Sequence, residues 1–166
     1  MIITAWRVTQ KSHADSAFTG LGAWLEAGRW NQKGVHMVYT AQSLSLAALE
    51  TVVHLPADAL LYNLYVYIPV EFDSKLVLEL PSSSLPADWK NHPPPDSTRE
   101  IGTSWVKEQK SPVLKVPSSV IPEEYNYLIN PLHSDFARLK IGKAISFTLD
   151  HTLIVDPGSG PHITFT

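Results

Sequence analysis

The sequence predicts an α+β fold organised as one domain, and three observations lead to that prediction. Segments rich in β-branched and aromatic residues are mixed with helical patterns, without the regular strand–helix–strand alternation of a parallel sheet. The chain of 166 residues is 44% hydrophobic, which suits one domain with its own core. Its 13 prolines mark the ends of elements and predict long connections.

Two strands and a short helical turn are predicted before residue 41. Residues 2–8 (IITAWRV) and 35–40 (VHMVYT) are rich in apolar and β-branched side chains, which favour strands. Between them, residues 15–28 (DSAFTGLGAWLEAG) are interrupted by glycines, which favour a loop with a short helical turn.

Residues 41–55 (AQSLSLAALETVVHL) are predicted to form a helix. Their apolar side chains fall on more than one face, which indicates that the helix is mostly buried. Thr40 is the expected N-cap, and Pro56 is expected to end the helix. Residues 60–69 (LLYNLYVYIP) then predict a strand that ends at Pro69.

The middle of the chain predicts a strand, a long connection and a second helix. Residues 75–80 (KLVLEL) are expected to be the strand, and the Pro- and Ser-rich residues 81–96 the connection. Residues 97–110 (STREIGTSWVKEQK) predict the helix. Ser97 is its expected N-cap and Glu100 follows three residues later, which is a capping-box pattern.

The last part of the chain predicts two more strands and a tail. Residues 112–118 (PVLKVPS) and 143–149 (KAISFTL) are the expected strands. Residues 123–133 (EEYNYLINPLH) are expected to form a helical turn or loop that stops at the proline. Residues 156–166 carry Gly and Pro and are expected to form a peripheral tail, which leaves 1–155 as the domain.

Charge and composition exclude several classes of function. The net charge is −3 and the Lys and Arg residues are scattered, which argues against nucleic-acid binding by this chain alone. The chain has no cysteine, which excludes disulfides and thiol chemistry and fits a reducing compartment. No stretch approaches the roughly 20 apolar residues of a membrane span. With no signal-peptide pattern at the N-terminus, we expect a cytoplasmic protein.

Common catalytic and metal-binding motifs are missing from the sequence. It contains no GxGxxG, GxxxxGK[ST], HExxH or GxSxG pattern. Glu50 and His54 lie four residues apart on the predicted helix, so both could reach one ion. A surface or core pair is the better interpretation of two residues at this spacing. We therefore expect no metal site.

Two charged residues are candidates for function. Arg29, in AGRWNQKG, carries a planar guanidinium suited to phosphate or carboxylate groups. The residues alone favour the alternative of a turn, with Arg29 exposed and Trp30 in the core. Glu50 lies among apolar residues of a helix that is expected to be buried, where a carboxylate is costly unless it is paired or functional. A glutamate at the rim of the helix is an equally good interpretation.

The remaining polar candidates have an ordinary structural explanation when each is taken alone. Tyr39 offers a ring for stacking and one hydroxyl, but such a tyrosine is more often part of the core. Ser118 and Ser119 lie between prolines, where serines often form turns, and no partner activates them as nucleophiles. Asn126 and Asn130 fit a turn beside the following proline.

The order of these residues along the chain is more specific than any one of them. The series WR, GRWN..G..V.Y, SLAALE..VH, VL.VPS and N.LINP.H resembles the RES domain family, whose members are toxins of bacterial RES–Xre toxin–antitoxin pairs. The similarity extends over residues 6–153. One departure is EAGRWN, where the family pattern has GGRWN. The resemblance implies a fold like that of ADP-ribosyltransferase toxins, with a split sheet around a cleft for NAD.

The resemblance also implies a set of site residues. The arginine and glutamate of the family name correspond to Arg29 and Glu50, and its serine to Ser118, with Ser119 as the alternative register. Its active-site tyrosine corresponds to Tyr39. Arg29 is then expected to clamp phosphate or ribose oxygens, Glu50 to stabilise the positive ribose as nicotinamide leaves, and Tyr39 to stack on nicotinamide. Ser118 is expected to orient a ribose hydroxyl or Glu50.

Arg7 and Asn126 complete the residues that are expected to bind NAD. The implied function is a toxin that depletes NAD as a glycohydrolase or phosphorylase. A protein ADP-ribosyltransferase and a non-enzymatic binding module are the alternatives. The implied partner is an Xre-type helix-turn-helix antitoxin that blocks the active site and supplies DNA binding, in a complex that can contain a homodimer of this chain.

Overall fold

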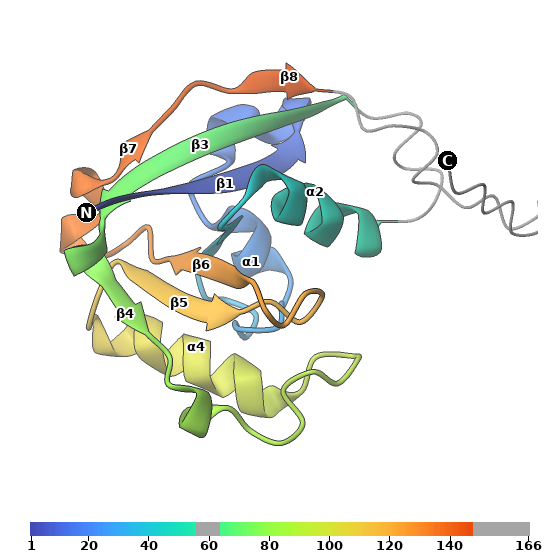
Figure 1. Ribbon diagram of the computed structural model, residues 1–166, viewed down its shortest axis with the longest axis vertical. Coiled ribbons are helices and arrows are strands. Elements are labelled where there is room, and N and C mark those ends of the chain that lie inside the picture. Colours follow the sequence, from blue (N-terminus) through green and yellow to red (C-terminus); the bar gives the residue numbers. More distant parts are fainter. Residues whose placement is uncertain (56–63, 148–166) are drawn as a thin grey trace, which may run out of the picture.

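One curled sheet with helices around it forms the molecule, in the computed structural model that describes residues 1–55 and 64–147 (Figure 1). Its strands are β1 (Ile2–Gln10), β2 (Val38–Ala41), β3 (Tyr65–Asp73), β4 (Val77–Glu79), β5 (Val113–Pro117), β6 (Tyr125–Ile129), β7 (Lys140–Ile141) and β8 (Ile145–Phe147). The α-helices are α1 (Leu21–Leu25), α2 (Leu44–Val53) and α4 (Asp96–Glu108). The 3-10 helices are η1 (Lys11–Ser16), η2 (Ser74–Leu76), η3 (Ser82–Ser84) and η4 (Ser134–Arg138). The predicted α+β class is confirmed.

The sheet is divided into two halves at one junction. Its strand order is β4-β5-β6-β2-β1-β3-β7, and β8 also pairs with β3. β1 and β3 pair over the whole of β1, whereas β1 and β2 pair only at Trp6 and Ala41. The two halves are therefore β4-β5-β6-β2 and β1-β3-β7-β8, and the junction between β1 and β2 is the split that the resemblance implies.

The helix α2 packs across this junction. Leu46 and Ala47 are buried on it, against Ala41 of β2 and beside Trp6 and Val8 of β1. Figure 1 shows α2 between the strands of the two halves. Because Glu50 follows on the same helix, this packing places its carboxylate beside the split.

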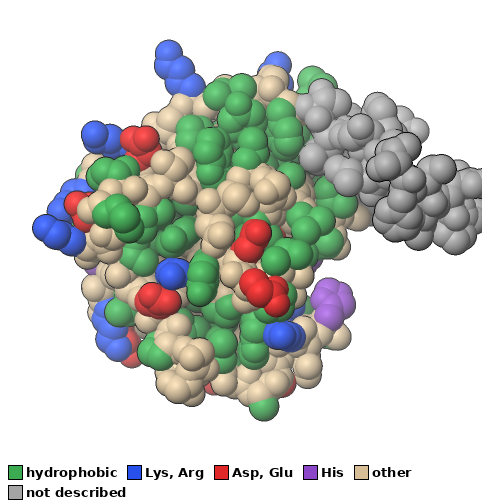
Figure 2. Space-filling view, viewed as in Figure 1, with side chains coloured by type: hydrophobic (Ala, Val, Ile, Leu, Met, Phe, Trp, Pro, Cys, Tyr) green, Lys and Arg blue, Asp and Glu red, His purple; other side chains and the backbone are tan. Residues whose placement is uncertain are grey.

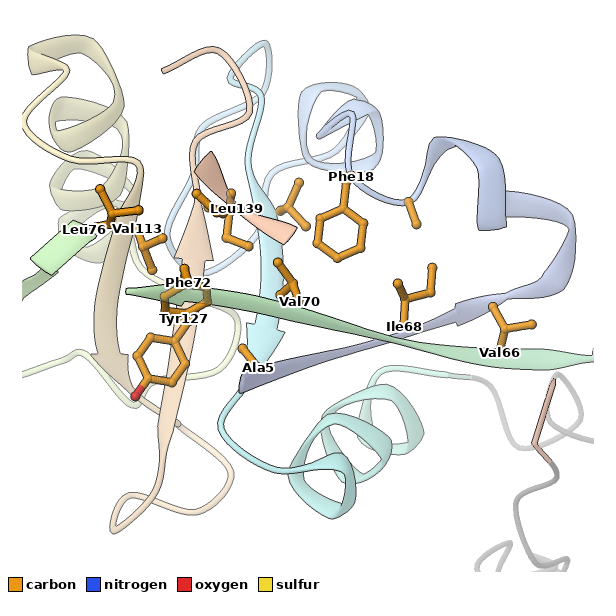
Figure 3. Close-up of a cluster of buried hydrophobic side chains, with 13 residues drawn as sticks. Ala5, Phe18, Val66, Ile68, Val70, Phe72, Leu76, Val113, Tyr127 and Leu139 are labelled. Carbon is orange, nitrogen blue, oxygen red and sulfur yellow. The ribbon is translucent and has the colours of Figure 1, made fainter. Parts of the chain in front are cut away.

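The largest core cluster joins the two halves from the opposite face. Val66, Ile68, Val70 and Phe72 of β3 point into this cluster (Figure 3). Phe72 meets Tyr127 of β6 in an edge-on arrangement, with ring centroids 5.5 Å apart. Aromatic pairs of this kind stabilise beyond the area that they bury, so the halves remain joined although their ladder is nearly broken.

A second core cluster fixes the loop that contains Arg29. Trp30 is only 2% exposed and packs with Trp105 of α4 and with Leu114 and Leu128 of β5 and β6. Gly102 of α4 allows this approach, because a Cβ there would lie 1.8 Å from the Trp30 carbonyl oxygen. The expected burial of Trp30 is confirmed, and it anchors the residue next to Arg29.

The predicted N-cap of the first long helix is wrong. Thr40 lies in β2, where its hydroxyl donates to the Tyr127 carbonyl oxygen at 2.7 Å. The helix begins at Leu44, and the side chain of Ser43 caps it by accepting from the Leu46 N–H at 3.1 Å. A β-branched threonine fits the strand, and the serine three residues later takes the capping role.

The predicted capping box of the second helix is also wrong. α4 begins at Asp96, and Pro95 is the N-cap without a side-chain bond. Ser97 instead donates to the Asp88 carboxylate at 2.7 Å. Ser97 is thus the second residue of α4, and its hydroxyl ties the helix to the preceding connection instead of capping it.

Pro69 does not end its strand, as β3 continues to Asp73. The Pro69 carbonyl oxygen accepts from Gly142 N–H at 2.8 Å, on the outer side of β3. The proline nitrogen faces the same side, in the gap between the pairings of β7 and β8. No ladder bond to β1 is lost there, so the proline is tolerated.

Residues 123–133 contain β6 rather than a helical turn or loop, which corrects that prediction. β6 is central, paired with β2 on one side and β5 on the other. β1 continues two residues beyond its predicted end, β3 continues beyond Pro69, and β2, β4 and β5 are shorter than predicted. β7 was not predicted. Predictions that concern Pro56, residues 60–63, residues 148–149 and the tail lie outside the described residues.

Candidate active site

A cavity of about 580 Å³ opens at the split of the sheet. Its walls come from β1, β2, β6, α1, α2, the loop that contains Arg29 and the connection before α4. Five of the predicted site residues line it: Arg7, Arg29, Tyr39, Glu50 and Asn126. Pockets of 300–1,000 Å³ are usual for small-molecule sites. The fold thus brings residues 119 positions apart in the sequence, from Arg7 to Asn126, to one cavity.

The carboxylate of Glu50 is held asymmetrically. Its Oε1 accepts from Ser118 Oγ at 2.7 Å and from Asn126 Nδ2 at 3.0 Å. Its Oε2 has His54 Nε2 at 3.8 Å, which is beyond hydrogen-bond distance. One carboxylate oxygen is therefore fixed by the protein. The other remains available to a ligand.

Ser118 acts on Glu50 and does not reach the cavity. Its side chain is fully buried, and its Oγ accepts from the N–H groups of Val120 and Ile121 at 3.1 and 3.0 Å. Its own hydroxyl proton goes to Glu50. Of the two adjacent serines, Ser119 is the one that lines the cavity. The geometry favours orientation of Glu50 as the role of Ser118, not contact with a ribose hydroxyl.

Arg29 is anchored to the connection before α4. Its Nη1 donates to the carbonyl oxygens of Trp89 and Asn91 at 2.6 and 3.1 Å. Burial lowers the pKa of the Arg29 guanidinium, and the negative charge of Glu50 acts in the opposite direction. Arg29 thus fixes one wall of the cavity as well as supplying positive charge to it.

Tyr39 lines the cavity, and its hydroxyl is hydrogen-bonded to neighbouring residues of the protein. The hydroxyl donates to Asn31 Oδ1 at 2.6 Å and accepts from the Trp30 N–H at 3.0 Å. Burial raises the pKa of the Tyr39 phenol far above its ordinary value. The hydroxyl is therefore not an acid or base at neutral pH, and contact with a ligand is left to the ring.

Asn31 is a site residue that the sequence analysis missed. It is fully buried, accepts from the Gly28 N–H at 3.1 Å and donates to the Ala23 carbonyl oxygen at 2.7 Å. Gly28 is required beside it, since a Cβ there would lie 2.6 Å from Tyr39 Oη. The signal was present in the GRWN pattern, in which only the arginine and tryptophan were assigned a role.

The sequence and fold of this chain are similar to those of known proteins. The sequence model of the RES domain family matches residues 4–150 of the chain. The chain belongs to the RES domain family. Its similarity to the Toxin Res of Yersinia enterocolitica is 36% identity over 149 residues, covering 89% of this chain and 97% of that toxin.

Two further similarities extend the picture of this RES domain. It is 36% identical over 159 residues to the Prs ADP-ribosylating toxin of Sphingobium sp. strain YBL2, covering 93% of this chain and 98% of that protein. In structure it is similar to a chain of the MbcT–MbcA toxin–antitoxin complex of M. tuberculosis, with a TM-score of 0.70. That match has 18% identity and covers 89% of this chain and 85% of the other, so it supports the fold.

Arg7 carries a positive charge that has no carboxylate partner in the ion pairs of the described residues. Its Nη1 donates to the Tyr39 carbonyl oxygen at 2.9 Å, across the split. Its Nε is buried and has no hydrogen-bond partner among the described residues. Burial lowers the pKa of Arg7 to about 10, so the side chain remains charged at neutral pH. The side chain as a whole is half-buried and lines the cavity. A charge drawn partly out of water without an opposite partner is costly, which makes Arg7 a candidate for holding an anion.

Arg99 is a second residue that was missed, and it supports the loop from behind. Its Nε donates to the Gly28 carbonyl oxygen at 3.1 Å.

Among residues 1–55 and 64–147, no group of three His, Asp or Glu side chains is placed to hold a metal ion. In the same part of the chain, no helix combines the length and the apolar character that a membrane span needs.

Proposed function

We propose that this RES domain is a toxin that cleaves the bond between nicotinamide and ribose in NAD. One observation carries the proposal: Glu50, with one oxygen fixed and one available, lies on the same cavity as two arginines, Arg7 and Arg29. A carboxylate beside two guanidinium groups suits a ligand that combines a ribose with a pyrophosphate. The names of the relatives, Toxin Res and Prs ADP-ribosylating toxin, support both the toxin role and NAD as the substrate.

Glu50 is assigned to the reacting ribose. As nicotinamide leaves, C1′ of the ribose takes on positive charge, and a preorganised carboxylate stabilises it. Ser118 and Asn126 fix the carboxylate before the substrate arrives, so the Oε2 atom needs no reorientation. Oε2 can then accept from the ribose 2′-hydroxyl or face C1′ directly.

Both arginines are assigned to the phosphates of NAD, and their roles there differ. Arg7 has no carboxylate partner in the ion pairs of the described residues, and its Nε is unpaired. Arg29 already donates twice to backbone carbonyls. We therefore assign the main contact with the pyrophosphate to Arg7, whereas the sequence favoured Arg29. Arg29 holds the cavity wall and adds charge.

Tyr39 is assigned to nicotinamide through its ring alone. The positively charged nicotinamide ring of NAD is attracted to an aromatic face. The hydroxyl is committed to Asn31 and Trp30, which keeps the ring in one orientation. Loss of the positive charge when nicotinamide departs weakens this contact, and that favours release of the product.

The acceptor of the ADP-ribosyl group separates two forms of this function. Water or phosphate as the acceptor gives a glycohydrolase or phosphorylase, and a protein acceptor gives an ADP-ribosyltransferase. The relative from Sphingobium, with its name of ADP-ribosylating toxin, favours the second form. Labelled NAD in a cell lysate distinguishes the two forms, because a labelled protein band indicates a protein acceptor.

The partner proposed for this chain is an antitoxin that blocks the cavity. The related MbcT–MbcA structure is a toxin–antitoxin complex, which supports a partner of this class. We extend the proposal to an Xre-type helix-turn-helix protein, which supplies DNA binding, and to a homodimer of this chain within the complex. Acidic and basic side chains are interspersed on the face shown in Figure 2, in keeping with DNA binding by the partner. We further propose a cytoplasmic location, a domain of residues 1–155 and a tail of residues 156–166.

Release of nicotinamide from NAD by the purified protein tests the function. Glu50→Gln is expected to lower the rate by about 10²–10³-fold, because it removes the charge that stabilises the transition state. Glu79→Gln is the matched control, since Glu79 is exposed and pairs with Lys115 away from the cavity. The antitoxin should abolish release by the wild type. Release by Glu50→Gln at the wild-type rate would contradict the proposal.

A further inference from the structure

His54 lies one helical turn after Glu50 and lines the same cavity. It is the C-cap residue of α2, and its Nε2 is 3.8 Å from Glu50 Oε2. The side chain of His54 is 57% exposed, whereas that of Glu50 is 18% exposed. The imidazole is thus on the solvent side of the carboxylate, where a small molecule enters from water.

His54 faces only one of the two carboxylate oxygens of Glu50. Ser118 and Asn126 both donate to Oε1, and His54 faces Oε2. A separation of 3.8 Å is too long for a direct hydrogen bond. Two atoms so placed can each lie about 2.8 Å from one shared oxygen atom. A water molecule can therefore touch both the imidazole and the carboxylate beside the reacting ribose.

We propose that His54 is the general base that activates a water molecule as the acceptor. This inference rests on the proposed cleavage of NAD. The bond between C1′ and the nicotinamide nitrogen breaks, and its electron pair leaves with neutral nicotinamide. The water oxygen forms a bond to C1′, and the neutral Nε2 of His54 takes the proton that the water releases. His54 then passes that proton to solvent, so the products are ADP-ribose, nicotinamide and one proton.

The competing explanation is that His54 merely pairs with Glu50. On that explanation, loss of the imidazole would disturb the position of the Glu50 carboxylate itself. The two explanations differ in what happens after nicotinamide leaves. A base acts only when water attacks, whereas a disturbed Glu50 slows the cleavage as well. Exchange of labelled nicotinamide into NAD reports cleavage and return without water, so it separates the two steps.

The experiment measures hydrolysis and nicotinamide exchange with the full chain and its variants. In His54→Ala, formation of ADP-ribose should fall by about 10²-fold, the usual lower range for loss of a general base. Nicotinamide exchange should persist, so the ratio of exchange to hydrolysis rises. Phosphate dianion, which attacks without losing a proton, should restore capture in His54→Ala. His54→Gln should behave like His54→Ala, and His13→Ala, exposed and outside the cavity, should behave like the wild type.

Each other outcome overturns the inference. An equal fall of hydrolysis and exchange in both His54 variants means that the residue only supports Glu50. An unchanged ratio means that it has no role in capture. Release of nicotinamide by the wild type without formation of ADP-ribose means that water is not the acceptor. In these cases the cleavage of NAD still stands. If the wild type releases no nicotinamide at all, the proposed function fails together with the inference.

Discussion

At the residue scale, two adjacent serines have different positions: one supports Glu50 and the other lines the cavity. Ser118 is fully buried and bonds to Glu50, whereas Ser119 lines the cavity. Ser118→Ala removes a hydrogen bond to a charged group, worth about 1.5–3 kcal/mol, and we expect kcat to fall about 10–100-fold with little change in KM. Steady-state kinetics of nicotinamide release measure the effect. Ser119→Ala should leave kcat within a few-fold, and a larger loss in Ser119→Ala than in Ser118→Ala would reverse this assignment.

Residue-level prediction from the sequence selected residues that the structure places at one cavity, but it missed the contacts that hold them there. Arg29, Tyr39, Glu50 and Asn126 reach one cavity, as the family resemblance implied. Their burial and partners could not be read from types and spacing. Asn31 and Ser118 matter through contacts that exist only after distant strands meet, so their roles depend on tertiary structure.

At the element scale, α4 and the Arg29 loop approach each other at backbone distance. A Cβ at Gly102 would lie 1.8 Å from the Trp30 carbonyl oxygen, and backbone cannot move aside as a flexible side chain can. Gly102→Ala is therefore expected to lower the free energy of unfolding by about 1–3 kcal/mol or more. The shifted loop should also lower the rate of nicotinamide release. Urea unfolding monitored by tryptophan fluorescence gives the stability change.

Gly22→Ala is the control for that prediction. Gly22 lies in α1, and a Cβ there meets no atom within 4 Å. Alanine in a helix is favoured over glycine by about 0.5–1 kcal/mol, so this variant should be as stable as the wild type or slightly more stable. Equal destabilisation of both variants would show that the contact with Trp30 is not the cause.

The elements that the sequence predicted well are those decided by local composition. β1, β5, α2 and α4 were placed correctly within a few residues. β6 was misassigned because its proline and asparagine neighbours suggested a turn, although pairing on both sides fixes it as a central strand. Pro69 was given too much weight, since its missing N–H costs nothing on the outer side of β3. Both errors arise from partners far away in sequence.

At the scale of the whole molecule, the split places the half-buried positive charge of Arg7 between the two halves of the sheet. Burial lowers the pKa of Arg7 to about 10, well below the ordinary value for an arginine. A depressed pKa on a basic group means that the folded state binds its proton less tightly than the unfolded state. The resulting penalty is therefore present in full below about pH 10 and is relieved only as the pH rises above that value. An anion bound beside Arg7 offsets the same penalty at neutral pH.

Ligand-linked stability tests this view of the split. ADP-ribose at about 100 times its Kd should stabilise the wild type by about 2.7 kcal/mol, which corresponds to a rise in Tm of about 5–10 °C for a chain of this size. Arg7→Gln should lose most of that rise, because the pyrophosphate no longer meets the positive charge of Arg7. Nicotinamide riboside, which lacks a pyrophosphate, is the control ligand and should shift both proteins equally. Thermal unfolding at neutral pH measures all four combinations. If Arg7→Gln keeps the full response to ADP-ribose, the phosphates are held by Arg29 instead.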